Sequence, residues 1–92
     1  MRALLISYDL GSPESSSDYQ KISDYIKKNF NYVKPLYSQY LVATDKSTAT
    51  VRDEMKNLND SNDKVLVIDV TGDGWASNNL PSSVTDWMKT NM

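Results

Sequence analysis

Short apolar runs along the chain predict the strands of this protein. Residues 1–9 form a nearly continuous apolar run that ends in polar residues, and residues 64–70 form a second run of the same kind. Such runs are typical of strands that are covered on both faces. Between them, residues 32–44 are rich in aromatic and β-branched residues, and Pro35 interrupts the segment. Because proline has no amide proton, this segment predicts two short antiparallel strands that meet near residues 37 and 38.

Apolar residues recur at helical spacing in three other segments. The first predicts a helix over about 18–29, where Ser17 and Gln20 form a capping box. The second predicts a helix capped by Ser47, and the third predicts a short C-terminal helix capped by Ser83. The apolar stripes consist of Tyr19, Ile22, Ile26 and Phe30, then Val51, Met55 and Leu58, and finally Val84, Trp87 and Met88.

The order of these elements is β-α-β-β-α-β followed by a helix. This order predicts an α+β, ferredoxin-like sandwich, in which a four-stranded antiparallel sheet carries both main helices on one face. We expect a single domain over residues 1–92, with its core in residues 1–70 and a C-terminal extension over residues 71–92. The open face of the sheet needs a cover, so we expect a homodimer whose sheets pack face to face. The rings available for that interface, or alternatively for ordinary core packing, are Tyr32, Tyr37, Tyr40 and Trp75.

Composition excludes several kinds of chemistry. The chain has no cysteine and no histidine, which excludes disulfides, zinc sites built on thiolate or imidazole, and Ser-His or Cys-His nucleophiles. Lysine and arginine total 10 against 12 acidic residues, so the net charge of −2 gives no overall attraction to a polyanion. No apolar stretch has the length of a membrane span, and the N-terminal run does not resemble a signal peptide. We therefore expect a soluble cytoplasmic protein without membrane contact.

Several of these segments together resemble a known family. These segments are Ile6-Ser7-Tyr8-Asp9, Tyr32-Val33-Lys34, Ser38 in the following hairpin, and Asp63-Lys64-Val65-Leu66-Val67. Over residues 1–70 the chain resembles the second universal CRISPR adaptation protein, a small ferredoxin-like homodimer. Residues 45–75 and the ending Asp86-Trp87-Met88-Lys89 are closer still to small bacterial and phage proteins catalogued as SinR-like, which imply no settled activity.

The CRISPR resemblance implies a divalent-metal-dependent nuclease. In that family the aspartate that ends the first strand, here Asp9, approaches a twofold axis from each protomer and binds Mg²⁺ or Mn²⁺ for phosphodiester hydrolysis. Hard divalent cations prefer oxygen ligands and can deliver a water nucleophile. Ser38 corresponds to a hydroxyl near that axis and would help to place the phosphate. Pro35 departs from the basic and polar hairpin of the family, so a non-catalytic role stays open.

Two further sets of residues are candidates for binding. One set could form a basic strip along the phosphates of RNA or DNA, or stay solvated: Arg2, Lys27, Lys28 and Lys34. The other set could bind a ligand or form an interface: Tyr8, Tyr37, Tyr40 and Trp75. The second hypothesis is accordingly a non-catalytic homodimeric module for a partner protein or a nucleotide-like ligand, with the serine-rich residues 12–17 folded over it. Asp9 favours the nuclease, whereas the acidic net charge favours the binding module.

Overall fold

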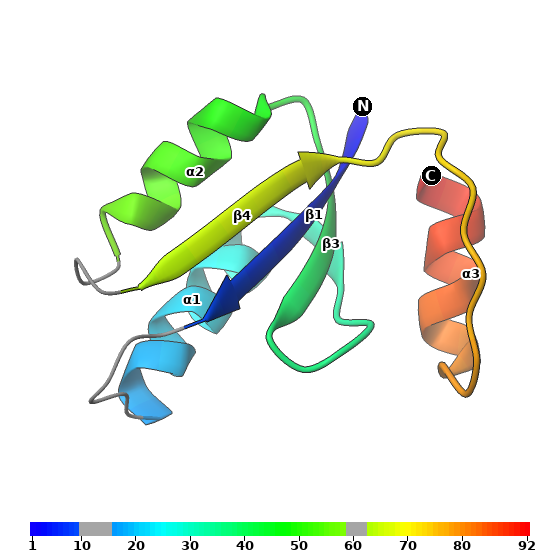
Figure 1. The fold of residues 1–92 in the computed structure, drawn as a ribbon, viewed down its shortest axis with the longest axis horizontal. Helices are drawn as coiled ribbons and strands as arrows, with labels where there is room; N and C mark the ends of the chain where they lie inside the picture. The colour runs from blue at the N-terminus through cyan, green and yellow to red at the C-terminus, as the bar shows by residue number, and fades with distance from the viewer. Residues whose placement is uncertain (10–15, 59–62) are drawn as a thin grey trace.

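The computed structural model is a mixed α+β fold with one antiparallel sheet, and it describes residues 1–9, 16–58 and 63–92 (Figure 1). The four strands lie in the order β2-β3-β1-β4, so β1 and β3 are central. This order is compatible with the expected ferredoxin-like arrangement. Within the described ranges no helix is both long enough and apolar enough to cross a bilayer. The elements are β1 (Arg2–Asp9), α1 (Ser16–Asn29), β2 (Asn31–Val33), β3 (Gln39–Thr44), α2 (Thr48–Lys56), β4 (Lys64–Asp69) and α3 (Ser82–Asn91).

The main core lies between the sheet and the helices α1 and α2. Successive side chains of a strand point to opposite faces, so every second residue of β1 and β3 faces these helices. The apolar stripes of α1 and α2 cover that face, as their helical spacing predicted. The buried residues of this core are Leu4, Ile6, Tyr8, Ile22, Ile26, Phe30, Tyr40, Val42, Val51 and Met55.

The opposite face of the sheet is partly covered by α3. Val84 and Met88 of α3 are buried together with Leu41 of β3. The indole Nε1 of Trp87 donates a hydrogen bond of 2.9 Å to Oδ1 of Asn31 at the start of β2. The chain's own C-terminal helix therefore covers part of the face that we expected a second sheet to cover, and α3 packs as a part of the fold.

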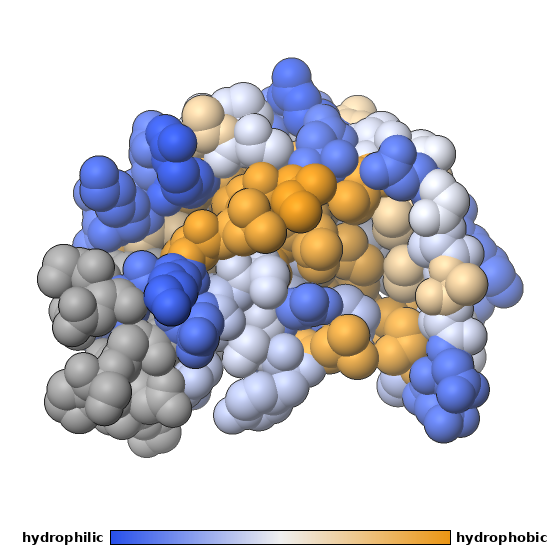
Figure 2. All heavy atoms as spheres, viewed as in Figure 1, coloured by the Kyte–Doolittle hydropathy of each residue, from blue (hydrophilic) through white to orange (hydrophobic). Residues whose placement is uncertain are grey.

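The same face exposes an apolar surface along β4. In Figure 2 a hydrophobic band crosses the middle of the molecule over this strand. Leu66 and Ile68 of β4 are 58% and 42% exposed, although both are large apolar side chains. By contrast, the rings of Tyr32 and Tyr40 lie on the helix side of the sheet, where they pack in or against the main core. For these two rings the core-packing alternative applies.

The start of α2 is confirmed, and that of α1 differs by a short shift. Ser47 has an extended backbone (φ −74°, ψ 162°), and its Oγ accepts a hydrogen bond of 3.1 Å from the amide of Thr50. This is the N-cap geometry that satisfies one free amide of the first turn. Helix α1 already begins at Ser16, so Ser17 is inside the helix and is not its N-cap.

The predicted cap of α3 is wrong. Pro81 is the N-cap residue, with no side-chain cap hydrogen bond, and Ser83 is the second residue of the helix. The carbonyl of Pro81 accepts hydrogen bonds of 3.0 and 3.2 Å from the amides of Val84 and Thr85. Pro81 itself has an extended backbone (φ −59°, ψ 149°), and because its carbonyl accepts the first bonds of the helix, α3 starts at Ser82, two residues earlier than the serine pattern indicated. The predicted apolar face is confirmed, since Val84 and Met88 are buried.

The two serines provide a matched test of capping. Replacing Ser47 with alanine is expected to lower the free energy of unfolding by about 1 kcal/mol, because it removes the acceptor for the Thr50 amide. Ser83→Ala is expected to leave stability almost unchanged, since Ser83 caps nothing. Urea unfolding followed by circular dichroism measures both. Equal losses in the two variants would contradict the capping assignment.

A polar network joins α1 to α2 beside the main core. The Oη of Tyr25 donates a hydrogen bond of 2.6 Å to Oε1 of Glu54, and Nζ of Lys46 donates to both carboxylate oxygens of Glu54 at 2.8 and 3.0 Å. The hydrogen bond from Lys46, followed by that from Tyr25, lowers the pKa of Glu54 below its usual 4.5, although burial opposes the shift. Burial and the neighbouring Glu54 raise the pKa of the Tyr25 phenol.

This network makes stability depend on pH on the acid side. A carboxyl group with a lowered folded-state pKa contributes stability above its unfolded value of 4.5, and the contribution is lost as pH falls through the folded-state value. The loss of free energy of unfolding caused by Glu54→Gln is therefore expected to be larger at about pH 7 than at about pH 3. Asp53→Asn is the control, because among the described residues Asp53 pairs with its exposed neighbour Arg52 alone. A Glu54→Gln effect that does not change with pH would contradict the expectation.

Candidate functional site

The clearest candidate site is a hollow of about 180 Å³ on the helix side of the sheet, which we call the tyrosine pocket. It lies where α1 meets the end of β1, the start of β3 and the loop between β2 and β3. Aromatic rings and polar groups both line it, so it offers flat surfaces together with hydrogen-bond donors. Its lining consists of Tyr8, Tyr19, Gln20, Ser23, Lys34, Tyr37, Ser38 and Tyr40.

The four tyrosine rings of the pocket form a continuous series from the core to the surface. Tyr40 and Tyr8 are stacked, with ring centroids 6.3 Å apart and an angle of 16° between the planes. Tyr8 is 6.1 Å from Tyr19, and Tyr19 is 6.4 Å from Tyr37. The inner rings, those of Tyr40 and Tyr8, are buried, whereas Tyr37 is 81% exposed. The inner rings are thus held rigidly by the core, and the outer ring presents its surface to solvent.

The loop between β2 and β3 holds the mouth of the pocket in place. The carbonyl of Ser38 accepts a hydrogen bond of 3.2 Å from the amide of Tyr8, and the carbonyl of Leu36 accepts one of 3.2 Å from Gln39. Ser38 has a φ of 61°, which is uncommon for a residue with a side chain and is often found at functional loops. Pro35 lies in the same loop, outside the strands, where no hydrogen bond of the sheet requires the amide proton that proline lacks.

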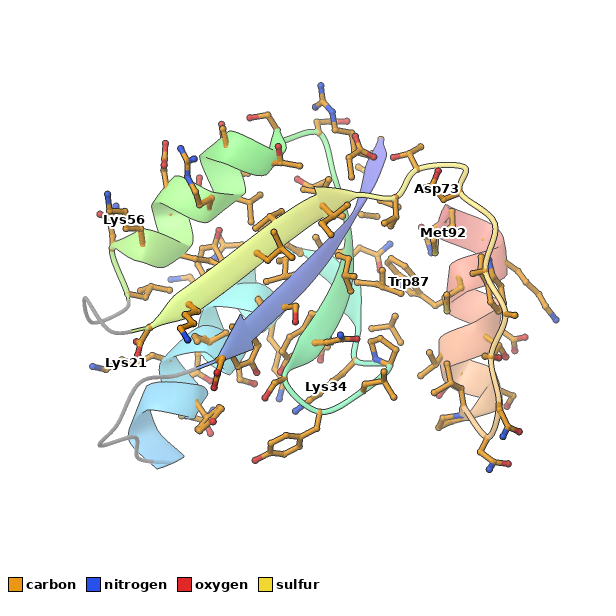
Figure 3. The ribbon with its side chains drawn as sticks, in the orientation of Figure 1. Lys21, Lys34, Lys56, Asp73, Trp87 and Met92 are labelled. Atoms are coloured by element: carbon orange, nitrogen blue, oxygen red, sulfur yellow. The ribbon has the colours of Figure 1, made fainter. Side chains whose placement is uncertain are left out.

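Lys34 brings a positive charge to this mouth. Its Nζ lies 5.2 Å from the ring centroid of Tyr37 and 5.5 Å from that of Tyr40, within the range of cation–π attraction. Figure 3 labels Lys34 beside the loop that joins β2 to β3. The side chain is exposed, so its ammonium group is oriented by the two rings and still accessible to an anion.

The buried phenol of Tyr8 can donate a hydrogen bond in the pocket. Burial, and then the nearby Tyr40, Tyr19 and Tyr37, raise the pKa of the Tyr8 phenol to about 12. The phenol therefore keeps its proton throughout the physiological range. The Oη of Tyr40 donates a hydrogen bond of 3.3 Å to Oγ of Ser23. A cationic lysine beside protonated phenols suits a ligand that combines a flat ring with an anionic or acceptor group.

Asp9 lies outside the tyrosine pocket. It is exposed at the end of β1, directly opposite Lys64 of β4, and it lines a separate hollow of about 210 Å³ with Ser7, Tyr8 and Leu66. A divalent cation needs several oxygen ligands, whereas this hollow offers one carboxylate beside an ammonium group. In the described part of the chain, no three Asp or Glu side chains come together to hold a metal ion. The described residues of a single copy therefore do not supply the set of oxygen ligands that Mg²⁺ or Mn²⁺ needs.

The predicted catalytic pair is divided between the two hollows. Ser38 lines the tyrosine pocket, whereas Asp9 lines the hollow beside Lys64. Tyr8, which precedes Asp9 in β1, lines both hollows and is the only described residue that does so. Residues 12–17, which we expected to fold over a ligand, lie largely outside the described residues.

The four basic candidates do not form one strip. Arg2 begins β1, where it lies 3.8 Å from Asp69 and donates a hydrogen bond to the carbonyl of Asp45. Lys27 and Lys28 are in the last turn of α1, just before β2. The first residue of β2 lies opposite Ala43 of β3, and Ala43 lies opposite Ala3 of β1, so this end of β2 is near the start of β1. Lys34 follows the other end of β2. The sheet register therefore places Lys34 toward the opposite end of the strands from the other three.

The fourth ring candidate is on the other side of the sheet. Trp75 lines an apolar hollow of about 310 Å³ between the sheet and α3, together with Leu36, Leu41 and Met88. It is thus separated by the sheet from Tyr8 and the other pocket tyrosines. The structure brings together three of the four predicted ring residues, namely Tyr8, Tyr37 and Tyr40.

Three residues of the pocket were not predicted as site residues: Tyr19, Gln20 and Ser23. The sequence analysis assigned Tyr19 to the apolar stripe of the first helix. Tyr19 and Ser23 are one helical turn apart, so they lie on the same face of α1. Their polar hydroxyls at that spacing were a usable signal of a polar site at the start of the helix.

Known proteins provide no family for this chain: no family model matches it, and no solved structure matches it at a significant level. The resemblance to CRISPR adaptation proteins and to SinR-like proteins therefore stays a hypothesis.

Proposed function

We propose that the protein is a non-catalytic binding module that holds a nucleotide-like ligand in the tyrosine pocket. The observation that carries this proposal is the position of the Lys34 ammonium group, 5.2 and 5.5 Å from the rings of Tyr37 and Tyr40. A nucleobase stacks on exposed aromatic rings, and a lysine neutralises a phosphate group. A nucleotide carries a base and a phosphate group a short distance apart, and the pocket places an aromatic ring and an ammonium group a short distance apart.

The charge distribution favours a small ligand over a long nucleic acid. The net charge is −2, and Arg2, Lys27 and Lys28 lie away from Lys34. Tight binding of a nucleic acid needs several cationic side chains along its backbone. The pocket volume of about 180 Å³ is also smaller than that of sites for drug-sized ligands, and it suits a single ring system with an attached anionic group.

The proposal takes the domain as ferredoxin-like. Its support is the chain order of β1, α1, β2, β3, α2 and β4 together with the strand order β2-β3-β1-β4. In this arrangement the end of β1 lies beside the start of β3, because the two strands are antiparallel neighbours. The tyrosine pocket depends on that neighbourhood, since Tyr8 is the second-last residue of β1 and Tyr40 is the second residue of β3.

A divalent-metal-dependent nuclease acting on RNA or DNA is the second candidate. One observation favours it: Asp9 is exposed, and its neighbour Tyr8 lines both hollows. Because Asp9 alone does not fit Mg²⁺ or Mn²⁺, this function needs a further carboxylate from a second copy. Incubation with either ion and short RNA or DNA tests it. Cleavage that Asp9→Ala abolishes would support the nuclease, and no cleavage by the wild type would exclude it for these substrates.

Calorimetric titration with three related compounds tests the binding module. A nucleoside monophosphate is expected to bind more tightly than the corresponding nucleoside or ribose 5-phosphate, because each of these lacks one of the two groups that the pocket recognises. Equal affinity for the nucleotide and the nucleoside would remove the phosphate contact from the proposal. Absence of binding by all four common monophosphates at millimolar concentration would overturn it.

A further inference from the structure

The hollow between the sheet and α3, which we call the apolar hollow, lies on the other side of the sheet from the tyrosine pocket. It is lined by Leu5 of β1, Leu41 of β3 and Met88 of α3, among others. Its volume of about 310 Å³ exceeds the 180 Å³ of the tyrosine pocket. Small-molecule sites usually have volumes of ~300–1,000 Å³. Among the described residues none lines both hollows, so a ligand in the apolar hollow leaves the tyrosine pocket free.

Most of the lining of the apolar hollow is aliphatic or aromatic. Leu41 and Met88 are buried, whereas the large side chains of Leu36 and Trp75 are exposed. Placing an apolar group against this lining removes apolar surface from water, which is favourable. Met88 and Met92 have flexible side chains, which adapt to the shape of such a group.

Asp73 is the only charged residue among the described residues that line the apolar hollow. Its amide donates a hydrogen bond of 3.1 Å to the carbonyl of Val70, and Gly72 between them has a φ of 72°. A positive φ at this position of a turn favours glycine. The turn thus holds Asp73 at the hollow, where Figure 3 labels it near Met92, which lines the same hollow.

The carboxylate of Asp73 has no ionic partner within the described part of the chain. The neighbouring acid Asp69 differs, because its carboxylate accepts two hydrogen bonds from Thr71 and lies 3.8 Å from Arg2. No salt bridge or side-chain hydrogen bond of the described residues involves Asp73, and none of their lysines or arginines lines the hollow. A negative charge is therefore left without a counterion beside an apolar surface.

Trp75 supplies a second group that attracts a cation at the same hollow. It lies two residues after Asp73, and its indole ring is partly exposed. Among aromatic side chains, indole attracts a cation over its face most strongly. A carboxylate accepts charge-assisted hydrogen bonds from an ammonium group. Two groups that favour a positive charge therefore border an apolar hollow.

We infer that the apolar hollow binds a small organic amine in its protonated form. The apolar body of the amine contacts Leu41 and Met88, and its ammonium group meets Asp73 and Trp75. A cavity of ~150 Å³ holds benzene, so a volume of about 310 Å³ holds a ring with a short alkyl chain. A bare metal ion would find a single carboxylate here, which is too few ligands. Because the sheet separates the two hollows, amine binding does not depend on the proposed nucleotide binding.

Three compounds of matched shape test this site in the wild-type protein, namely phenylpropylamine, phenylpropanol and phenylpropanoate. An NMR titration of ¹⁵N-labelled protein is expected to show that the amine shifts the indole signal of Trp75 and the amide signal of Asp73. The amine is expected to bind about 3- to 10-fold more tightly than the alcohol, because it alone gains the attraction of the carboxylate and the indole. The carboxylate compound is expected to bind most weakly.

Asp73→Asn separates the charge contact from the apolar contact. It is expected to reduce the affinity for the amine to about that for the alcohol, and to leave the affinity for the alcohol unchanged. Because Asp73 is exposed, we expect the variant to keep the fold, which circular dichroism checks. The matched control is Asp86→Asn, which changes an exposed aspartate of α3 that does not line the hollow. It is expected to bind all three compounds as the wild type does.

Four results would contradict amine binding in the apolar hollow. Equal affinity of the wild type for the amine and the alcohol would remove the cation contact, and so would unchanged amine binding by Asp73→Asn. No shift of the Trp75 indole at millimolar amine would exclude the hollow as a ligand site. Trp75 signals that change with protein concentration, and not with the amine, would assign the hollow to a second copy of the chain.

Discussion

Tyr37→Ala is expected to weaken binding of a nucleoside monophosphate about 5- to 150-fold, because stacking of one base on an aromatic side chain contributes ~1–3 kcal/mol. Tyr37 is the outermost ring of the tyrosine pocket and is 81% exposed, so its removal leaves the core intact. Calorimetry with wild-type and variant protein measures the change. Tyr37→Phe keeps the ring and is expected to bind almost as tightly as the wild type.

Lys34→Gln separates the phosphate contact from the stacking contact. It is expected to weaken binding of the monophosphate and to leave binding of the nucleoside nearly unchanged, since only the phosphate uses the ammonium group. Lys56→Gln is the control, because Lys56 is also exposed but lies at the end of α2. If Lys34→Gln weakens both ligands equally, or if Tyr37→Ala weakens neither, the assigned roles of these residues are wrong.

Leu4→Ala is expected to lower the free energy of unfolding by about 2–5 kcal/mol. Leu4 lies in the central strand β1 and is completely buried against α1 and α2, so truncation leaves a cavity that the surrounding core cannot fill. A domain of this size has a total stability of only ~5–15 kcal/mol, so the variant loses a large part of it. Urea unfolding measures the change.

Leu36→Ala is the matched control for this core prediction. Leu36 is 56% exposed in the loop between β2 and β3, and its truncation is expected to change stability by less than about 0.5–1 kcal/mol. Similar losses in the two variants would show that the division between core and surface described above is incorrect.

The elements of the fold could be predicted because their patterns are local. The continuous apolar run of β1 and the helical spacing of α1 and α2 reflect which faces are buried, and each can be read within a few residues. The run of β4 predicted a strand covered on both faces, but this prediction is wrong: β4 is an edge strand, and Leu66 and Ile68 are 58% and 42% exposed. The position of α3 could not be predicted in this way. Val84 and Met88 indicate an apolar helix face, but nothing near them in the sequence indicates that it packs against Leu41 of β3. The second face of the sheet was therefore expected to be open.

The candidate site was predicted in separate pieces. Tyr8, Lys34, Tyr37, Ser38 and Tyr40 were all proposed from the sequence, but for different roles. They meet because β1 and β3 are antiparallel neighbours, so that the end of one strand lies beside the start of the other.

The pairing of β2 with β3 explains why the sequence did not show that Lys34 is separated from the other basic residues. β2 is only three residues long, and it carries the chain from the region of Lys28 toward the opposite end of the sheet before Lys34. Residues that are close in sequence are thus separated by the length of that strand. Sequence distance alone does not show this separation, whereas strand pairing does.

The most direct test of the tyrosine pocket is an NMR titration of ¹⁵N-labelled protein with a nucleoside monophosphate. Our account predicts that the amide signals of Tyr8, Lys34, Tyr37 and Ser38 shift with a common dissociation constant, while those of Lys28 and Trp75 stay in place. Shifts centred on Arg2 and Lys28, or no shifts at millimolar ligand, would contradict it.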